Sequence, residues 1–86
     1  MVTKPIQLTE HAAAAIAERK LLLRWIVEAA QKPEWTEPDL QWTGVERRFR
    51  AIPEYGNRIL RAACLETPTE TRIITAFFDR KAKRPK

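Results

Sequence analysis

Residues 58–66, RILRAACLE, and residues 71–80, TRIITAFFDR, are two apolar-rich stretches separated by the short segment TPTE. Proline and threonine in so short a connection are typical of a turn, and two strands joined in this way pair antiparallel. With Glu66 opposite Thr71, the pairs that follow are Cys64 with Ile73, Ala62 with Thr75, and Leu60 with Phe77. This face is apolar except for Thr75, so we expect helices to cover it.

The opposite face of the same two strands carries an arginine among apolar side chains. Its members are Ile59, Arg61, Ala63 and Leu65 beside Arg72, Ile74, Ala76 and Phe78. Arg61 falls near the middle of the predicted sheet, where its guanidinium loses water. It then needs a carboxylate, a carbonyl or a ligand to offset that loss. We also expect Asp79 to pair across the sheet with Arg58.

The chain before these strands predicts helices and then further strands. Apolar residues recur at helical intervals between Thr9, a good N-cap, and Gln31, and Pro33 ends the segment. The pattern fits one long helix or two helices with a break at RKLLL, residues 19–23. Residues 33–39, PEWTEPD, predict a loop, whereas LQWTG (40–44) and VERRFRAI (45–52) predict strands. The predicted fold class is α+β, with an N-terminal helix or helix pair packed on one face of a three- to four-stranded antiparallel sheet.

Length and composition predict one small cytoplasmic domain. The 86 residues include one cysteine and one histidine, so we expect no internal disulfide, no zinc site and no cofactor. No stretch approaches the roughly 18 apolar residues of a membrane helix, and the N-terminus lacks the apolar core of a signal peptide. We expect the α+β domain to span residues 1–79 and a basic tail to span residues 80–86.

The net charge of +5 resides in that tail, RKAKRPK, which holds five basic residues and no acid. The other 79 residues carry 11 basic and 11 acidic side chains, so the predicted domain is neutral. Such a tail fits contact with a phosphate backbone, but a frayed, solubilising end is the favoured interpretation.

His11, the only histidine, follows the predicted helix cap by two residues. Counted at about 100° per residue, it points away from the apolar stripe, so we do not expect it in the core. The positive end of a helix favours a neutral imidazole, which can accept a proton as a general base does. A surface histidine without a role also fits this position.

Positive charge inside the predicted domain is concentrated in RRFRAIPEYGNRILR, residues 47–61, whose arginines are Arg47, Arg48, Arg50, Arg58 and Arg61. Strand alternation predicts that Arg47 and Arg61 share one face and the other three share the opposite face. With Phe49 and Tyr55 nearby, this composition is typical of a nucleic-acid surface, and equally of salt-bridged edge strands. We expect the three tryptophans in core and rim packing rather than in base stacking.

Four segments together resemble the small DUF4258 domains: EHAAAAIAER (10–19), QKP (31–33), RILRAA (58–63) and RIITAFFDR (72–80). The resemblance covers roughly residues 6 to 80. It implies the helix-and-sheet fold of RelE-like toxin ribonucleases, with a site between the first helix and the sheet. The implied chemistry is metal-independent RNA cleavage, in which a ribose 2′-hydroxyl attacks the neighbouring phosphate. Many members have glycine where this chain has Lys20.

By the same resemblance, His11 would act as base or acid, Arg19 and Arg61 would hold phosphate, and Thr75 would orient one of them. The expected nucleic-acid contacts are Arg47, Arg48, Arg58 and Arg80. We therefore predict an RNA-binding protein with toxin-like ribonuclease activity, held by an antitoxin-like partner. The first alternative is a non-enzymatic interaction module whose Arg-rich sheet face binds an acidic protein or nucleic acid. The second is a degenerate toxin fold that forms a homodimer through its sheet face.

Overall fold

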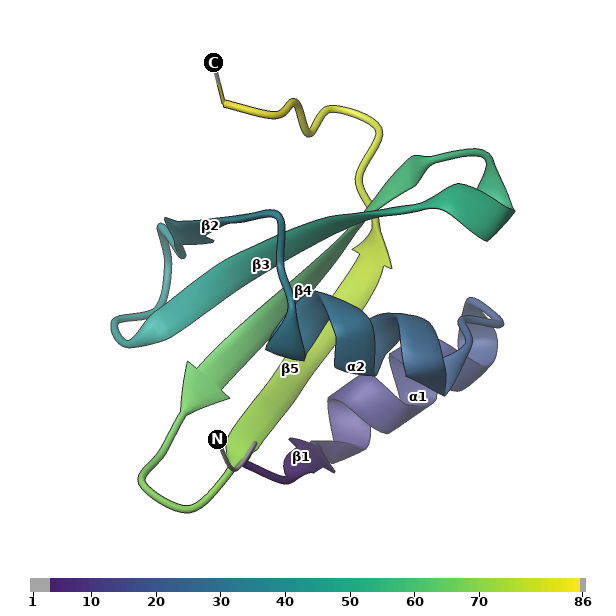
Figure 1. The fold of residues 1–86 in the computed structure, drawn as a ribbon. Coiled ribbons are helices and arrows are strands. Elements are labelled where there is room, and N and C mark those ends of the chain that lie inside the picture. Colours follow the sequence, from purple (N-terminus) through teal and green to yellow (C-terminus); the bar gives the residue numbers. More distant parts are fainter. Residues whose placement is uncertain (1–3, 86) are drawn as a thin grey trace.

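Two short helices lie on one face of a five-stranded sheet (Figure 1). The computed structural model describes residues 4–85. In chain order, the elements are β1 (Ile6–Leu8), α1 (Glu10–Glu18), α2 (Leu23–Gln31), β2 (Trp35–Pro38), β3 (Val45–Ile52), the 3-10 helix η1 (Pro53–Tyr55), β4 (Arg58–Glu66) and β5 (Thr71–Phe78). The predicted α+β class is confirmed.

The sheet has the strand order β1-β5-β4-β3-β2 and is mixed. β1 runs parallel to β5, and the other neighbouring strands are antiparallel. The prediction of three or four antiparallel strands is therefore wrong in the number of strands and in the direction of one pair. β1 has only three residues, and its partner lies at the other end of the chain, so no local pattern signals it.

The edge strand β2 forms where the sequence predicts a loop. The two prolines of this segment suggested the loop, but proline is tolerated on an edge strand. LQWTG, residues 40–44, is instead the connection between β2 and β3. Asp39 organises this connection, because its Oδ1 accepts the backbone N–H groups of Gln41 at 2.8 Å and Trp42 at 3.1 Å. These hydrogen bonds lower the pKa of Asp39.

The helical segment breaks into two helices at RKLLL, residues 19–23, which is one of the two predicted alternatives. Thr9 caps α1, and its hydroxyl accepts the N–H of Ala12 at 3.1 Å. Lys20, just beyond the helix, has φ 55, a left-handed conformation that turns the chain out of the helix. α2 ends at Gln31, before Pro33. Among residues 4–85, no helix is long and apolar enough to cross a membrane.

The core lies between the helices and the sheet. The helix segment contributes Ala12, Leu21, Trp25, Ile26, Ala29 and Ala30, and the sheet contributes Ile52, Leu60, Ala62, Cys64, Ile73 and Ala76. Leu60, Ala62, Cys64 and Ile73 thus lie on the helix-covered face, as predicted. Thr75 does not lie there.

A bulge in β5 places Thr75 on the opposite face. The pairs of Glu66 with Thr71 and of Cys64 with Ile73 follow the predicted register, but the next pair is Ala63 with Thr75. Ile74 is therefore an extra residue without a partner in the ladder. Beyond Ile74 the register is displaced by one residue. Leu60 therefore faces Phe78, whereas the predicted partner was Phe77. A shift of one residue reverses the face of each side chain that follows.

Candidate nucleic-acid interface

The sheet face turned away from the helices, here called the open face, carries a row of three aromatic rings and one guanidinium. The row consists of Trp35, Phe49, Arg61 and Phe77, one residue each from β2, β3, β4 and β5. Each residue is the direct cross-strand partner of the next. Direct partners project to the same side of a sheet, so the four side chains lie in one line across the open face.

The planes in this row are closely packed and partly accessible. The rings of Trp35 and Phe49 are stacked, with centroids 4.8 Å apart and planes within 4°. The Cζ atom of Arg61 lies 4.8 Å from the centroid of the Phe77 ring. Phe49 is buried, whereas the other three residues are half-buried. The row therefore exposes part of Trp35, Arg61 and Phe77 to solvent, whereas Phe49 is covered.

Arg61 has the carboxylate partner that its position requires. Its Nη1 donates to Oδ2 of Asp79 at 3.1 Å, and both side chains are largely buried. The expected pairing of Asp79 with Arg58 is thus wrong, because the displaced register brings the end of β5 beside Arg61. The other oxygen of Asp79 accepts the N–H of Lys81 at 2.9 Å. Asp79 therefore fixes both the guanidinium and the start of the tail.

Two other predicted site residues lie on the open face. Thr75 and Arg47 both pair with Ala63, from the strands on either side of β4, in the row next to Arg61. The prediction that Arg47 and Arg61 share a face is confirmed. Arg47 is ion-paired with Asp39, with Nε 3.3 Å from Oδ2. Ala63 itself is buried between them.

His11 and Arg19 lie in the helix layer, on the other side of the sheet. His11 is exposed on the first turn of α1, and Arg19 is exposed at its C-terminal end. The expected site between the first helix and the sheet is not formed, because core side chains such as Ala12 and Ile73 fill that space. The structure brings Arg61 and Thr75 together, but it separates them from His11 and Arg19.

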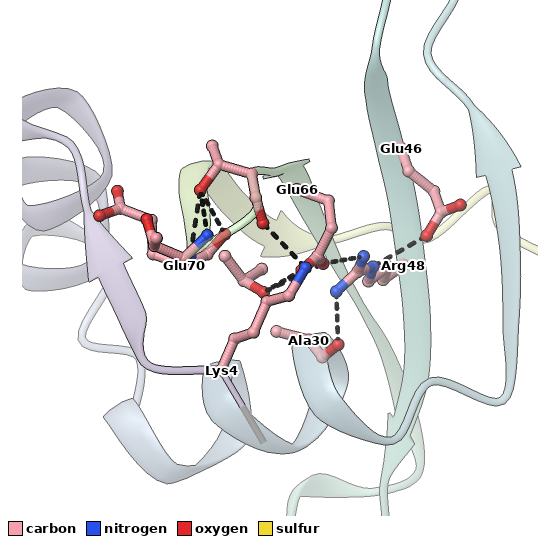
Figure 2. Close-up of polar contacts among 9 residues, drawn as sticks. Lys4, Ala30, Glu46, Arg48, Glu66 and Glu70 are labelled. Carbon is pink, nitrogen blue, oxygen red and sulfur yellow. Dashed lines mark hydrogen bonds and ion pairs between the residues drawn. The ribbon is translucent and has the colours of Figure 1, made fainter. Parts of the chain in front are cut away.

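Arg48 lies on the helix-covered face and is the centre of a polar network (Figure 2). Its guanidinium donates to the carbonyl of Ala30 at 2.7 Å, to Glu46 at 2.9 Å and to Glu66 at 2.8 Å. The Ala30 carbonyl belongs to the last turn of α2, which has no helical partner for it. The side chain of Arg48 is only 14% exposed. Arg48 therefore ties α2 to β3 and β4.

Glu66 receives a second cation in the same network. Lys4 Nζ lies 2.9 Å from Oε2 of Glu66, and the hydroxyl of Thr71 donates to both carboxylate oxygens. The contacts with Lys4 and Arg48 lower the pKa of Glu66 to about 2. The neighbouring thiol of Cys64 faces the core, and burial raises its pKa to about 12. This cysteine is not a nucleophile in the folded protein.

Arg58 and Arg80 lie together at the end of the sheet where β4 begins and β5 has ended. Both are exposed. Among residues 4–85, neither has a carboxylate within ion-pair distance, whereas Arg24, Arg47, Arg48, Arg50, Arg61, Arg72 and Arg84 all do. Thus two of the four arginines expected to contact nucleic acid lie at the same end of the sheet, and the positive charge of neither is balanced by an ion pair within the described residues.

Phe49 belongs to the predicted nucleic-acid surface, but Trp35 and Phe77 lie where the sequence does not predict them. Trp35 was assigned to a loop, and Phe77 to the helix-covered face. Trp35 and Glu37 share one face of β2, so its four residues show no apolar–polar alternation that could outweigh the prolines. The bulge at Ile74 leaves no trace in the sequence, because Ile74 and its neighbours are all good strand formers.

Comparisons of this chain with protein-family models, with curated proteins and with solved structures find no match. The resemblance to DUF4258 domains therefore stays a prediction, and the functional argument rests on the geometry of the chain itself.

Proposed function

We propose that this protein binds single-stranded RNA on the open face of its sheet. The observation that carries the proposal is the row of Trp35, Phe49, Arg61 and Phe77. Unpaired bases stack on aromatic rings and guanidinium planes, and such stacking tolerates any sequence. In a duplex the bases already stack on one another, so the row favours a single strand.

Charges close to the row supply attraction for phosphates. Within residues 4–85, Arg61 uses only Nη1 on a protein acceptor, which leaves other N–H groups of its guanidinium to donate. The tail adds Arg80, Lys81 and Lys83, none of which has an ion-pair partner in the described part of the chain. Contacts of this kind position a strand without reading its sequence.

Binding, rather than cleavage, is the function we propose. Cleavage by the implied chemistry requires a base and a phosphate-holding cation at one phosphate. His11 and Arg61 lie on opposite sides of the sheet, so the predicted catalytic set of His11, Arg19, Arg61 and Thr75 does not converge. The choice of RNA rather than DNA as the ligand comes from the resemblance, because the row by itself fits a single strand of either.

The test measures the anisotropy of a labelled RNA of about 12 nucleotides, which is within the usual length of such sites. The single strand, the same strand in a duplex, and a DNA strand of the same sequence are compared. Phe77→Leu and Trp35→Leu remove a stacking ring, and we expect each to weaken binding roughly tenfold. Trp42→Leu is the matched control, because Trp42 is an exposed tryptophan outside the row. Row variants that fold normally and bind like this control would refute the proposal.

Three further measurements extend the test. Single-strand binding should fall with salt, and replacing Lys81 and Lys83 together by Gln should reduce the salt slope by about 1.4, or about 0.7 for each lost phosphate contact. Incubation of the RNA with the wild-type protein or with His11→Ala, both in EDTA, tests metal-independent cleavage directly. Turnover that is lost in His11→Ala would show a ribonuclease whose site differs from the open face. Retention of an acidic protein but of no RNA would favour a protein partner.

A further inference from the structure

The end of the sheet beside the row is hollowed into a cleft of about 400 Å³. One wall is the turn after η1 with the start of β4, and it includes Asn57, Arg58 and Ile59. The other wall is the end of β5 with the start of the tail, and it includes Phe78 and Arg80. A cavity of this size holds about one nucleotide.

The cleft concentrates positive charge that no carboxylate compensates. Arg58 and Arg80 come from opposite walls, and they are two of the three arginines without an ion pair in residues 4–85; Arg19, on α1, is the third. The Cζ atom of Arg58 lies 5.1 Å from the centroid of the Tyr55 ring. A guanidinium held over a ring keeps its N–H groups free at the edge, where they can bind phosphate oxygens.

One carboxylate, that of Asp79, also belongs to the lining of the cleft. Both of its oxygens are occupied, one by Arg61 and the other by the N–H of Lys81. Its negative charge is therefore balanced by a cation outside the cleft. The net charge of the cleft is therefore positive, from Arg58 and Arg80, and it favours binding of an anion.

The cleft adjoins the row on the open face. Ile59 in its wall is two residues from Arg61 along β4, a distance of about 7 Å. Asp79 in the opposite wall is two residues from Phe77 and lies on the same face, whereas Arg58 and Phe78 project to the helix-covered side of the sheet end. A strand whose bases stack on the row reaches the cleft where it passes Ile59 and Asp79 at the end of the sheet.

We propose that this cleft binds the terminal phosphate of the strand that occupies the open face, a refinement that rests on the proposed function. A phosphomonoester carries nearly two negative charges at neutral pH, whereas an internal phosphodiester carries one. Two guanidiniums from opposite walls match that higher charge. The volume is close to that of one nucleotide, which suits the last nucleotide of the strand.

The experiment uses three single-stranded RNAs of one sequence: one with a 5′-phosphate, one with a 3′-phosphate, and one with hydroxyls at both ends. The readout is the ratio of affinities between phosphorylated and unphosphorylated RNA, which cancels the general attraction of the basic surface. We expect one phosphorylated strand to bind about tenfold more tightly than the unphosphorylated strand. Which of the two binds more tightly identifies the 5′ or the 3′ end.

Arg58→Gln and Arg80→Gln should each bring this ratio close to one. Arg19→Gln is the matched control, because it removes an arginine that also lacks an ion pair but lies on α1, and it should leave the ratio unchanged. Equal binding of all three RNAs would overturn the terminal-phosphate site and leave the proposed function standing. A ratio that survives in Arg58→Gln and Arg80→Gln would also overturn it. The absence of binding to every RNA would instead overturn the proposed function.

Discussion

Arg61 and Phe77 lie directly opposite each other on β4 and β5, and they do so because Ile74 has no partner in the ladder between these strands. In an uninterrupted register, Arg61 would face Ala76, and Phe77 would point into the core. One extra residue thus completes the row on the open face and brings Thr75 to the same side. The bulge is part of the candidate site, although it lies outside the row.

Deletion of Ile74 should preserve the row. Without Ile74, Ile73 and Thr75 become consecutive and keep Cys64 and Ala63 as partners, so the ladder becomes regular and no side chain changes face. We expect a loss of unfolding free energy on the order of 1 kcal/mol, partly because Thr9 loses one of its carbonyl acceptors. Deletion of Ala62, which is in register with β3 and β5 at once, should prevent folding. Thermal unfolding followed by circular dichroism distinguishes the two, and equal damage would contradict this view of the bulge.

Arg48→Met should destabilise the protein by on the order of 2 kcal/mol, because it removes the donor to the carbonyl of Ala30 and one of the two cations at the carboxylate of Glu66. Arg72→Met is the control. Arg72 is 53% exposed and pairs only with Glu70, so its loss should change stability by less than about 0.5 kcal/mol. Urea unfolding measures both variants, and similar values for the two would show that burial of Arg48 is unimportant.

The contribution of Glu66 should depend on pH. Its pKa is lowered from 4.5 to about 2 by Lys4 and Arg48, so the folded protein favours the carboxylate. This stabilisation is complete above about pH 4.5 and is lost as pH falls through about 2. The stability difference between wild type and Glu66→Gln should therefore be largest at neutral pH and shrink in acid. A constant difference across this range, measured by urea unfolding, would rule out the ion pairs as its cause.

The thiol of Cys64 should resist alkylation in the folded protein. Burial raises its pKa to about 12, so almost no thiolate forms at about pH 8. We expect iodoacetamide to label Cys64 in urea but not in native buffer, as mass spectrometry would show. Rapid labelling of the native protein would mean that β4 opens readily.

Lys20→Gly should stabilise the protein by about 0.5–1 kcal/mol, because glycine adopts the left-handed φ of this position without the steric cost that a side chain incurs. Lys32→Gly is the comparison. Lys32 ends α2 with φ −135, where glycine has no steric advantage, and the substitution should be neutral or destabilising. A gain in melting temperature for both variants, or for neither, would contradict the role given to the left-handed turn.

The sequence was sufficient for the parts of the fold that depend on local patterns. Thr9 as a cap and the meander of β3, β4 and β5 follow from helical spacing, strand alternation and turn chemistry, whereas the break at RKLLL was one of two alternatives. Alternation also separated Arg47 and Arg61 from Arg48, Arg50 and Arg58. These features need only residues that are close together in the chain.

The remaining features depend on contacts between distant residues. β1 is stabilised by pairing Ile6 with Thr71, and β2 by pairing Trp35 with Phe49, and neither strand is long enough to show a pattern of its own. The separation of His11 from Arg61 depends on which sheet face the helices cover, and the residues that settle this lie in the core. The candidate row could not be predicted for the same reason, because each of its four members comes from a different strand.

The strands that come first and last in the chain, β1 and β5, are neighbours in the sheet, and this order constrains how the protein folds during synthesis. During synthesis, β1 and the helices emerge early, but β5, which lies between β1 and β4, emerges last. Until then β1 has no hydrogen-bonding partner, and the helices lack Ile73 and Ala76 from the surface they cover. A ribosome-bound chain that stops short of Phe78 therefore exposes apolar helix surface, and the sheet is completed only after β5 has emerged.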